Sequence, residues 1–173
     1  MAQRRHRAAY LRLTSRSTDR LGYGDPVTSH LEPDAHASAD DSAVARHLAR
    51  AREGLARLTA EQALDEMQHG ALLVDTRTFE QRRVRGDVPG ALRIDRTVFE
   101  WRLDPTGPWC IPQVTGPDTR IIVMCRQGFS SSLAAASLQA IGLRLATDIV
   151  GGFEAWREAG LPVTGFVDPG DPD

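Results

Sequence analysis

Short apolar runs that end at a polar residue predict the strands of this protein. One run covers residues 71–75 and ends at Asp75, and a second covers residues 121–124 and is followed by Cys125. Continuous apolar runs of this length, with Val and Ile among them, are typical of strands that are buried on both faces. Two weaker runs, residues 91–94 and 146–150, predict two further short strands.

Residues 43–57 carry apolar side chains at helical spacing. Val44, Leu48, Ala51 and Leu55 would all lie on one face of a helix. This pattern predicts a linking helix that covers the whole segment and presents one apolar stripe to the rest of the protein.

Further helices are predicted around the four strands. The first follows a capping-box pattern, with Thr59 before the helix and Gln62 three residues later. Strands that alternate with helices at this spacing predict an α/β fold, in which a parallel sheet carries helices on both faces within a single domain. The helices so predicted cover residues 60–68, 79–84, 98–103, 130–140 and 153–159.

The first 42 residues differ in composition from the rest of the chain. They begin with closely spaced arginines, and residues 25–41 are acidic and rich in small side chains. Low hydrophobicity without periodicity predicts a flexible, disordered extension. A transit peptide, an over-extended reading frame and a partner-binding arm are alternatives, and we favour a dispensable tail. The predicted division is therefore an extension 1–42, a linking helix 43–57, a folded domain 58–165 and a tail 166–173.

Composition and charge exclude several classes of partner. Of the 173 residues, 41% are hydrophobic and 25% are charged, as in ordinary globular proteins. A net charge of −2 gives no reason to expect nucleic acid or a membrane surface, and no apolar run is long enough to cross a bilayer. Two cysteines, Cys110 and Cys125, make neither a disulfide framework nor a zinc-binding pair. We therefore expect a reducing, cytoplasmic setting, with no metal and no cofactor.

The segment that joins the second strand to the next helix is the candidate for chemistry. It places Cys125 at a strand end, Gly128 inside a short loop and Ser130 at the start of a helix. A loop that runs into a helix N-terminus directs several backbone N–H groups at one point, which favours an anion and lowers the pKa of a thiol. The pattern predicts an anion cradle around a nucleophilic sulfur. The alternative is a buried cysteine that only packs.

Four motifs, in order, resemble those of the single-domain rhodaneses over residues 58–165. Each motif is weak alone, whereas all four in this order are specific. They are the strand end Leu73-Val74-Asp75-Thr76-Arg77 with Glu80, the turn Gly86-Asp87-Val88-Pro89-Gly90-Ala91 with Asp87 in place of the usual His, the loop Cys125-Arg126-Gln127-Gly128-Phe129-Ser130-Ser131, and the closing signature Gly151-Gly152-Phe153-Glu154-Ala155-Trp156 followed by Ala159-Gly160-Leu161-Pro162-Val163.

The resemblance implies a sulfurtransferase. Cys125 would attack the outer sulfur of a donor such as thiosulfate and hold that sulfur as a persulfide, until cyanide, a thiol or a partner protein accepts it. Many rhodaneses carry Arg where this chain has Ser130, so backbone N–H groups and Arg126 must balance the charge of a bound anion. Asp75 and Arg77 are expected to support the site as scaffold, through an ion pair or hydrogen bonds. The residues expected to bind the donor are Arg126, Gln127, Gly128, Phe129, Ser130 and Ser131.

Two other functions compete with this one. Cell-cycle dual-specificity phosphatases share the sheet but carry Arg six residues after the cysteine, where this chain has Ser131, and this difference disfavours phosphatase activity. A persulfide carrier, or a rhodanese-like interaction module without appreciable small-molecule turnover, stays open as the alternative. In addition, we expect one of the serines 130–132 to cap the helix and Cys110 to be an ordinary loop cysteine.

Overall fold

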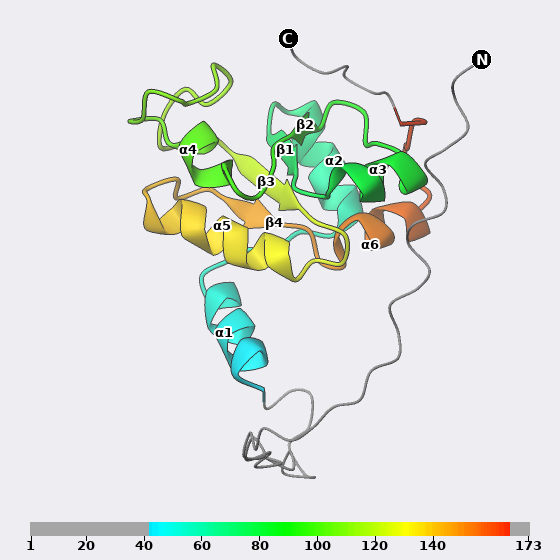
Figure 1. Cartoon of the computed structure of the whole chain (residues 1–173), viewed down its shortest axis with the longest axis horizontal. Coiled ribbons are helices and arrows are strands. Elements are labelled where there is room, and N and C mark those ends of the chain that lie inside the picture. Colours follow the sequence, from blue (N-terminus) through cyan, green and yellow to red (C-terminus); the bar gives the residue numbers. More distant parts are fainter. Residues whose placement is uncertain (1–41, 167–173) are drawn as a thin grey trace, which may run out of the picture. The chain divides into compact units, whose positions relative to one another are not determined.

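Two apolar strands, β1 (Leu72–Asp75) and β3 (Ile121–Met124), form the centre of a parallel sheet. The computed structural model describes residues 42–166, and the strand order in it is β2-β1-β3-β4 (Figure 1). The edge strands β2 (Leu92–Arg93) and β4 (Thr147–Asp148) are shorter than the segments predicted for them. Because all four strands are parallel, their carboxyl ends meet at the same edge of the sheet.

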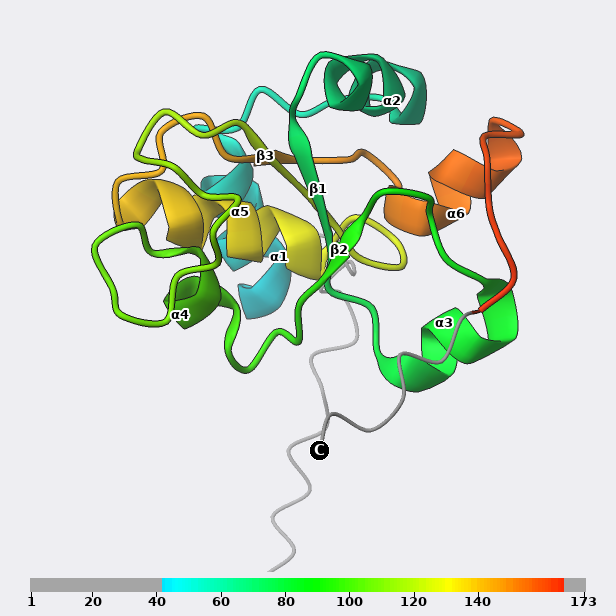
Figure 2. The ribbon, with the colours of Figure 1, turned by 90° about the horizontal axis from the view of Figure 1, so that it is seen from above.

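Helices cover both faces of this sheet, which confirms the predicted fold class. α2 (Ala60–Gln68) and α6 (Gly152–Glu158) pack on one face, and α4 (Phe99–Leu103) and α5 (Ser130–Ala140) pack on the other (Figure 2). The side chains of β3 alternate between the two resulting cores and are all buried. This burial on both faces explains why the strand is a continuous apolar run.

Threonines begin two of the helices. Thr59 Oγ1 accepts a hydrogen bond from the backbone N–H of Gln62, and the Gln62 side chain accepts one from the N–H of Thr59, which confirms the capping box predicted for α2. Thr78 and Gln81 form the same motif at the start of α3 (Phe79–Arg85). Such caps satisfy backbone N–H groups that have no partner inside the helix.

The first helix is shorter than predicted, and it is more than a linker. α1 spans Ala43–Arg52 and not residues 43–57, because Gly54 interrupts the helical run and the side chain of Leu55 turns into the core. α1 packs against α5. Leu58 then joins the sheet edge through a parallel bridge to Ile149. The segment that precedes α2 is therefore part of the folded domain.

The start of α5 also differs from the prediction. Its N-cap residue is Phe129, and no side-chain cap hydrogen bond is formed there, so the expectation that a serine caps this helix is wrong. Ser131 and Ser132 are fully buried instead and bind a carboxylate on β4. The serines lie one to three residues past the N-cap position, and a fully buried carboxylate needs hydrogen bonds from the groups around it.

Two predicted segments lie largely outside the described part of the chain. These are the extension, of which only residue 42 is described, and the tail, of which only residue 166 is described. Within residues 42–166, none of the helices has both the length and the apolar character that crossing a membrane requires.

Candidate active site

Cys125 directly follows β3, at the start of the loop that leads into α5. Its side chain is buried, with 5% of the residue exposed. The backbone N–H of Gly128 donates a hydrogen bond to Cys125 Sγ at 3.2 Å, and Sγ lies 3.2 Å from Ser131 Oγ. The fold thus brings together three of the residues predicted for the site.

Two glycines allow the chain to close around the sulfur. Gly128 has a φ of 75°, and a Cβ at this position would lie 2.8 Å from the nitrogen of Gly151. Gly152, with a φ of 60°, approaches so closely that a Cβ would lie 2.4 Å from the carbonyl oxygen of Cys125. Only glycine combines this backbone conformation with this lack of space. The N–H of Phe153 then donates to the same Cys125 oxygen at 2.9 Å, so the start of α6 fixes the strand end.

Burial acts to raise the pKa of the Cys125 thiol, but hydrogen bonds outweigh this effect. The side chains of Ser130 and Ser131, and the backbone N–H groups of Ser131 and Gln127, stabilise the thiolate. The pKa of Cys125 is therefore lower than that of an ordinary cysteine, as the loop pattern predicts. Because the thiolate is the nucleophilic form of cysteine, this site favours reaction at sulfur.

A buried carboxylate lies behind Ser131. Asp148, on β4, is fully buried, and its Oδ2 accepts hydrogen bonds from Ser131 Oγ at 3.0 Å and Ser132 Oγ at 2.8 Å. A hydroxyl group has a single hydrogen, so Ser131 accepts from the Cys125 thiol while it donates to Asp148. To stabilise the thiolate, Ser131 must turn its hydroxyl hydrogen from Asp148 towards the sulfur of Cys125. Asp148 then still accepts a hydrogen bond from Ser132.

Two arginines from the segment that precedes α2 contact the same loop. Arg57 forms an ion pair with Asp148, with Nε 2.7 Å from Oδ1 and Nη2 3.1 Å from Oδ2. Its Nη2 also donates to the carbonyl oxygen of Gly128 at 3.1 Å. Arg52 Nη2 donates to this same oxygen at 2.8 Å, and Arg52 Nε donates to Ser132 Oγ at 3.0 Å.

Arg52, Arg57 and Asp148 were not predicted from the sequence. The two arginines stand in an Arg-rich segment with no pattern that separates them from their neighbours. Asp148 did carry a signal, because an acidic residue inside a predicted buried strand needs a charged or hydrogen-bonding partner. The identity of that partner follows only from the fold, since Arg57 lies far from Asp148 in sequence.

Four of the predicted loop residues are exposed: Arg126, Gln127, Phe129 and Ser130. Arg126 forms an ion pair with Glu154 on α6, with Nε 3.0 Å from Oε1. Arg126 also lines a cavity of about 220 Å³. Phe129 is 55% exposed and therefore does not belong to the core.

Asp75 and Arg77 form the expected ion pair at the end of β1. The Nη2 of Arg77 lies 2.7 Å from Oδ2 of Asp75, and both side chains are almost fully buried. Arg77 also donates to the carbonyl oxygen of Gly86 at 3.0 Å, and its guanidinium stacks 3.5 Å from the centre of the Phe153 ring. The pair therefore holds the start of α6 against β1, and α6 in turn contacts Cys125.

Cys110 lies in the long loop between α4 and β3, away from these contacts. Its thiol faces the carbonyl oxygens of Ile111 and Val114 and packs against the α5 side of the core. Burial is the main cause of a raised pKa for Cys110.

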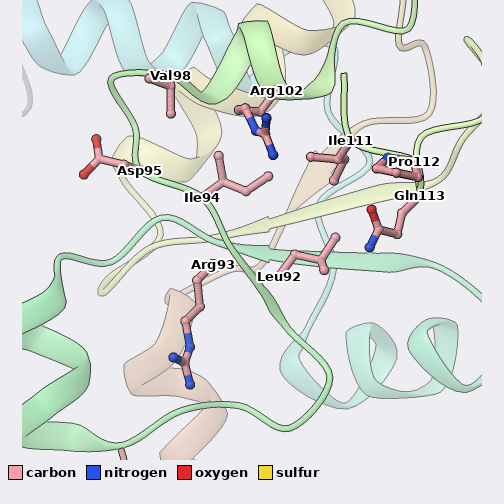
Figure 3. A pocket seen from close by; sticks show the side chains of 9 residues that line it. All are labelled: Leu92, Arg93, Ile94, Asp95, Val98, Arg102, Ile111, Pro112 and Gln113. Carbon is pink, nitrogen blue, oxygen red and sulfur yellow. The ribbon is translucent and has the colours of Figure 1, made fainter. Parts of the chain in front are cut away.

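A cavity of about 340 Å³ lies beside the same long loop. Arg102 and Ile111 are among the residues that line it, and none of its lining residues belongs to the Cys125 loop (Figure 3). Within residues 42–166, no three His, Cys, Asp or Glu side chains are placed to hold a metal ion.

This arrangement of strand, cysteine loop and helix belongs to a known class of domain. The model of the rhodanese-like domain family matches residues 59–159, more than half of the chain. The first three motifs that carry the resemblance lie inside this match, and the closing signature begins inside it and continues to Val163. The chain is therefore a member of the rhodanese-like domain family, which confirms the resemblance seen in the sequence.

Individual relatives support the same assignment. Thiosulfate sulfurtransferase GlpE of Haemophilus influenzae is 31% identical over 106 residues, which cover 61% of this chain and 91% of the relative. A structure from Rhodopseudomonas palustris, described as a protein of unknown function and possible tyrosine phosphatase, matches with a TM-score of 0.65 at 27% identity and covers 83% of this chain and 100% of that one. The polysulfide-sulfur transferase homodimer of Wolinella succinogenes matches the fold with a TM-score of 0.58 at 22% identity, over 73% of this chain and 90% of that one.

Proposed function

We propose that this protein is a sulfurtransferase that moves a sulfane sulfur from a small donor, such as thiosulfate, to a thiophilic acceptor through a persulfide on Cys125. The observation that carries the proposal is the buried Cys125 thiol, whose pKa is lowered by hydrogen bonds from its own loop. Membership of the rhodanese-like family, and the likeness to a thiosulfate sulfurtransferase, support it.

The first half of the reaction forms the persulfide. The Cys125 thiolate attacks the outer sulfur of thiosulfate with an electron pair, which makes a new S–S bond. The bond between the two sulfur atoms of thiosulfate breaks at the same time, and sulfite leaves with its electron pair. No proton transfer is needed once the thiolate has formed, so a loop that stabilises this anion is sufficient activation.

The second half returns the enzyme to its starting state. A thiophilic acceptor such as cyanide attacks the outer sulfur of the persulfide, and the Cys125 thiolate leaves with the bonding electrons. A thiol, or a partner protein that presents one, accepts the sulfur by the same attack. A reducing compartment such as the cytoplasm suits this cycle, because Cys125 must return as a free thiol each time.

The loop residues share the work of holding the donor. The N–H groups around the sulfur, including that of Gly128, stabilise negative charge on the thiolate and on the persulfide. Removing one such donor from comparable anion sites costs roughly 3 kcal/mol of transition-state stabilisation. Arg126 adds an exposed positive charge that attracts an anionic donor. In many rhodaneses this charge comes from an arginine at the place where this chain has Ser130.

Phosphatase activity is the less favoured function. The Rhodopseudomonas palustris structure is described as a possible tyrosine phosphatase, and it covers most of this chain. The phosphate-binding arginine of such enzymes would fall at Ser131, which is fully buried here and bound to Asp148. A carrier that passes its persulfide only to a protein partner is the other alternative.

The mass of the intact protein after incubation with thiosulfate tests the proposal. We expect the wild type to gain one sulfur atom, about 32 Da, that cyanide removes, and we expect Cys125→Ser to gain none. Cys110→Ser is the matched control and should behave as the wild type. If no sulfane donor loads Cys125, the sulfurtransferase proposal is wrong. Persulfide that accumulates but turns over slowly with cyanide and small thiols would favour the carrier, and hydrolysis of an aryl phosphate by wild type only would favour the phosphatase.

A further inference from the structure

We infer that Arg52 and Arg57 are positioning residues of the active site, which clamp the carbonyl oxygen of Gly128 and so restrict the residue whose N–H points at the Cys125 sulfur. Both arginines lie before residue 59, where the match to the rhodanese-like family begins. The inference rests on the proposed function, because it explains how this chain prepares the same cysteine for sulfur transfer.

The two backbone polar groups of Gly128, which belong to the successive peptide units on either side of its Cα, carry the inference. Its carbonyl oxygen accepts hydrogen bonds from Arg52 at 2.8 Å and from Arg57 at 3.1 Å, and Ser132 Oγ, whose hydrogen points to Asp148, lies 3.1 Å from it. Its N–H donates to Cys125 Sγ at 3.2 Å. Glycine has more conformational freedom than any other residue type, and Gly128 adopts a φ of 75°. External groups must therefore restrict the rotation of this residue, and donors on its oxygen do so.

The arginines are themselves held rigidly. Arg57 is fixed by two hydrogen bonds to the buried carboxylate of Asp148, and a planar guanidinium bound in this way has one orientation. Arg52 is fixed by Ser132 Oγ, and its guanidinium also lies 5.7 Å from the centre of the exposed Phe129 ring. The clamp thus spans α1, β4 and the first turn of α5.

Charge adds to this geometric effect. Arg52 and Cys125 interact electrostatically, in the direction that favours both the guanidinium cation and the thiolate. The charged side chains on the elements around the loop are Arg52 and Arg57 from the first segment, Asp148 from β4, and Arg126 with its partner Glu154 on α6. Arg57 is paired with the buried Asp148, and Arg126 is paired with Glu154 at the surface. Arg52 interacts electrostatically with Asp148 and with Cys125, so its charge also reaches the sulfur.

Alkylation of Cys125 as a function of pH tests the clamp in the full chain. Iodoacetamide reacts with thiolates, so the reaction rate at each pH reports the thiolate fraction without any sulfur donor. We expect Arg52→Ala to raise the pH of half-maximal alkylation and to slow the reaction at neutral pH by about three- to tenfold, which corresponds to a rise of roughly half to one pKa unit. Arg50→Ala is the matched control, because Arg50 is exposed in the same last turn of α1.

Two further measurements distinguish a loss of positioning at Gly128 from a loss of folding. Alkylation is followed at the peptide level, so Cys110 serves as an internal reference whose profile should not move. Arg52→Lys keeps the charge but cannot bind the Gly128 oxygen and Ser132 together, so we expect a smaller shift in the same direction. If Arg52→Ala folds poorly, Arg52→Lys decides the matter by itself. A wild-type Cys125 profile in the folded variants would overturn the clamp, whatever the persulfide experiment shows.

Discussion

At the scale of single residues, the reactivity of Cys125 is the balance of two opposing effects. Burial disfavours the thiolate, and hydrogen bonds from Ser130, Ser131 and backbone N–H groups favour it and prevail. Cys110 is less buried than Cys125, and there burial, together with the charge of Asp104, raises the pKa of the thiol. The chain therefore holds two partly or fully buried thiols with opposite shifts, and the N–H and O–H groups that face Cys125 lower its pKa against the effect of burial.

This contrast predicts the order in which the two thiols react. In the wild type, Cys125 should reach half-maximal alkylation below the ordinary pKa of cysteine, and Cys110 should reach it above that value. Peptide-level mass spectrometry after short pulses of iodoacetamide at a series of pH values measures both. Because thiolate formation at Cys125 is easier in the folded chain, it stabilises the fold above the ordinary thiol pKa, and this contribution is lost as the pH falls through the folded-state pKa. Equal titration of the two thiols would contradict the account of the site.

At the scale of elements, the start of α6 depends on the ion pair at the end of β1. Arg77 joins three pieces of the fold, since it binds Asp75 on β1, the carbonyl oxygen of Gly86 after α3, and the Phe153 ring on α6. The helix in turn donates to the Cys125 carbonyl oxygen. The pair thus supports the site through α6.

Removal of Arg77 should destabilise the protein strongly. Arg77→Ala leaves the buried carboxylate of Asp75 without its charge partner, and such losses cost about 3–5 kcal/mol of the free energy of unfolding. Urea denaturation of the variant measures this change. Arg83→Ala is the control, because Arg83 forms an exposed pair with Glu80 and should unfold like the wild type.

A second variant identifies the cause of that loss. Replacing both partners, as Asp75→Leu with Arg77→Met, removes the buried charge together with its partner and should recover much of the stability. A double variant as unstable as Arg77→Ala would show that the contacts to Gly86 and Phe153 matter more than the charge.

At the scale of the whole molecule, the folded unit is larger than the family match. Residues 42–58 supply Leu55 to the core, Leu58 to the sheet edge, and Arg57 to the buried Asp148. These contacts include some of the most distant pairs in the described sequence, and they close the domain around β4 and α5. The site therefore draws on both ends of the folded chain.

Truncation tests this wider boundary. A chain that begins at residue 42 keeps every contact described above and should retain the thermal stability and the Cys125 alkylation profile of the full protein. A chain that begins at residue 59 leaves the Asp148 carboxylate buried without Arg57, a loss of at least about 3 kcal/mol. For a domain of this size we expect its melting temperature to fall by roughly 10 °C or more. Equal melting temperatures for the two truncated chains would contradict the boundary.

Local features of this protein could be predicted from its sequence. The strands β1 and β3, the helices α2, α3 and α5, and the Thr59 capping box follow from patterns within a few residues of each other. The position of Cys125 at a strand end, before a glycine and a helix, also belongs to this local level, and the serine hydroxyl and backbone N–H groups of that same segment lower the pKa of Cys125.

The surroundings of the loop could not be predicted in this way. Residues 53–57 fit a helical pattern, yet the chain turns at Gly54, because Leu55 and Arg57 have better partners in the core and at Asp148. The serines at the start of α5 fit the pattern of a helix cap, yet Ser131 and Ser132 bind the carboxylate of Asp148 on β4. Hydrophobic periodicity and capping depend on neighbours in the chain and can therefore be predicted from the sequence. The pairing of Arg52, Arg57 and Asp148 around Gly128 depends on how strands and helices cross, and only the folded chain brings those charges within hydrogen-bonding distance.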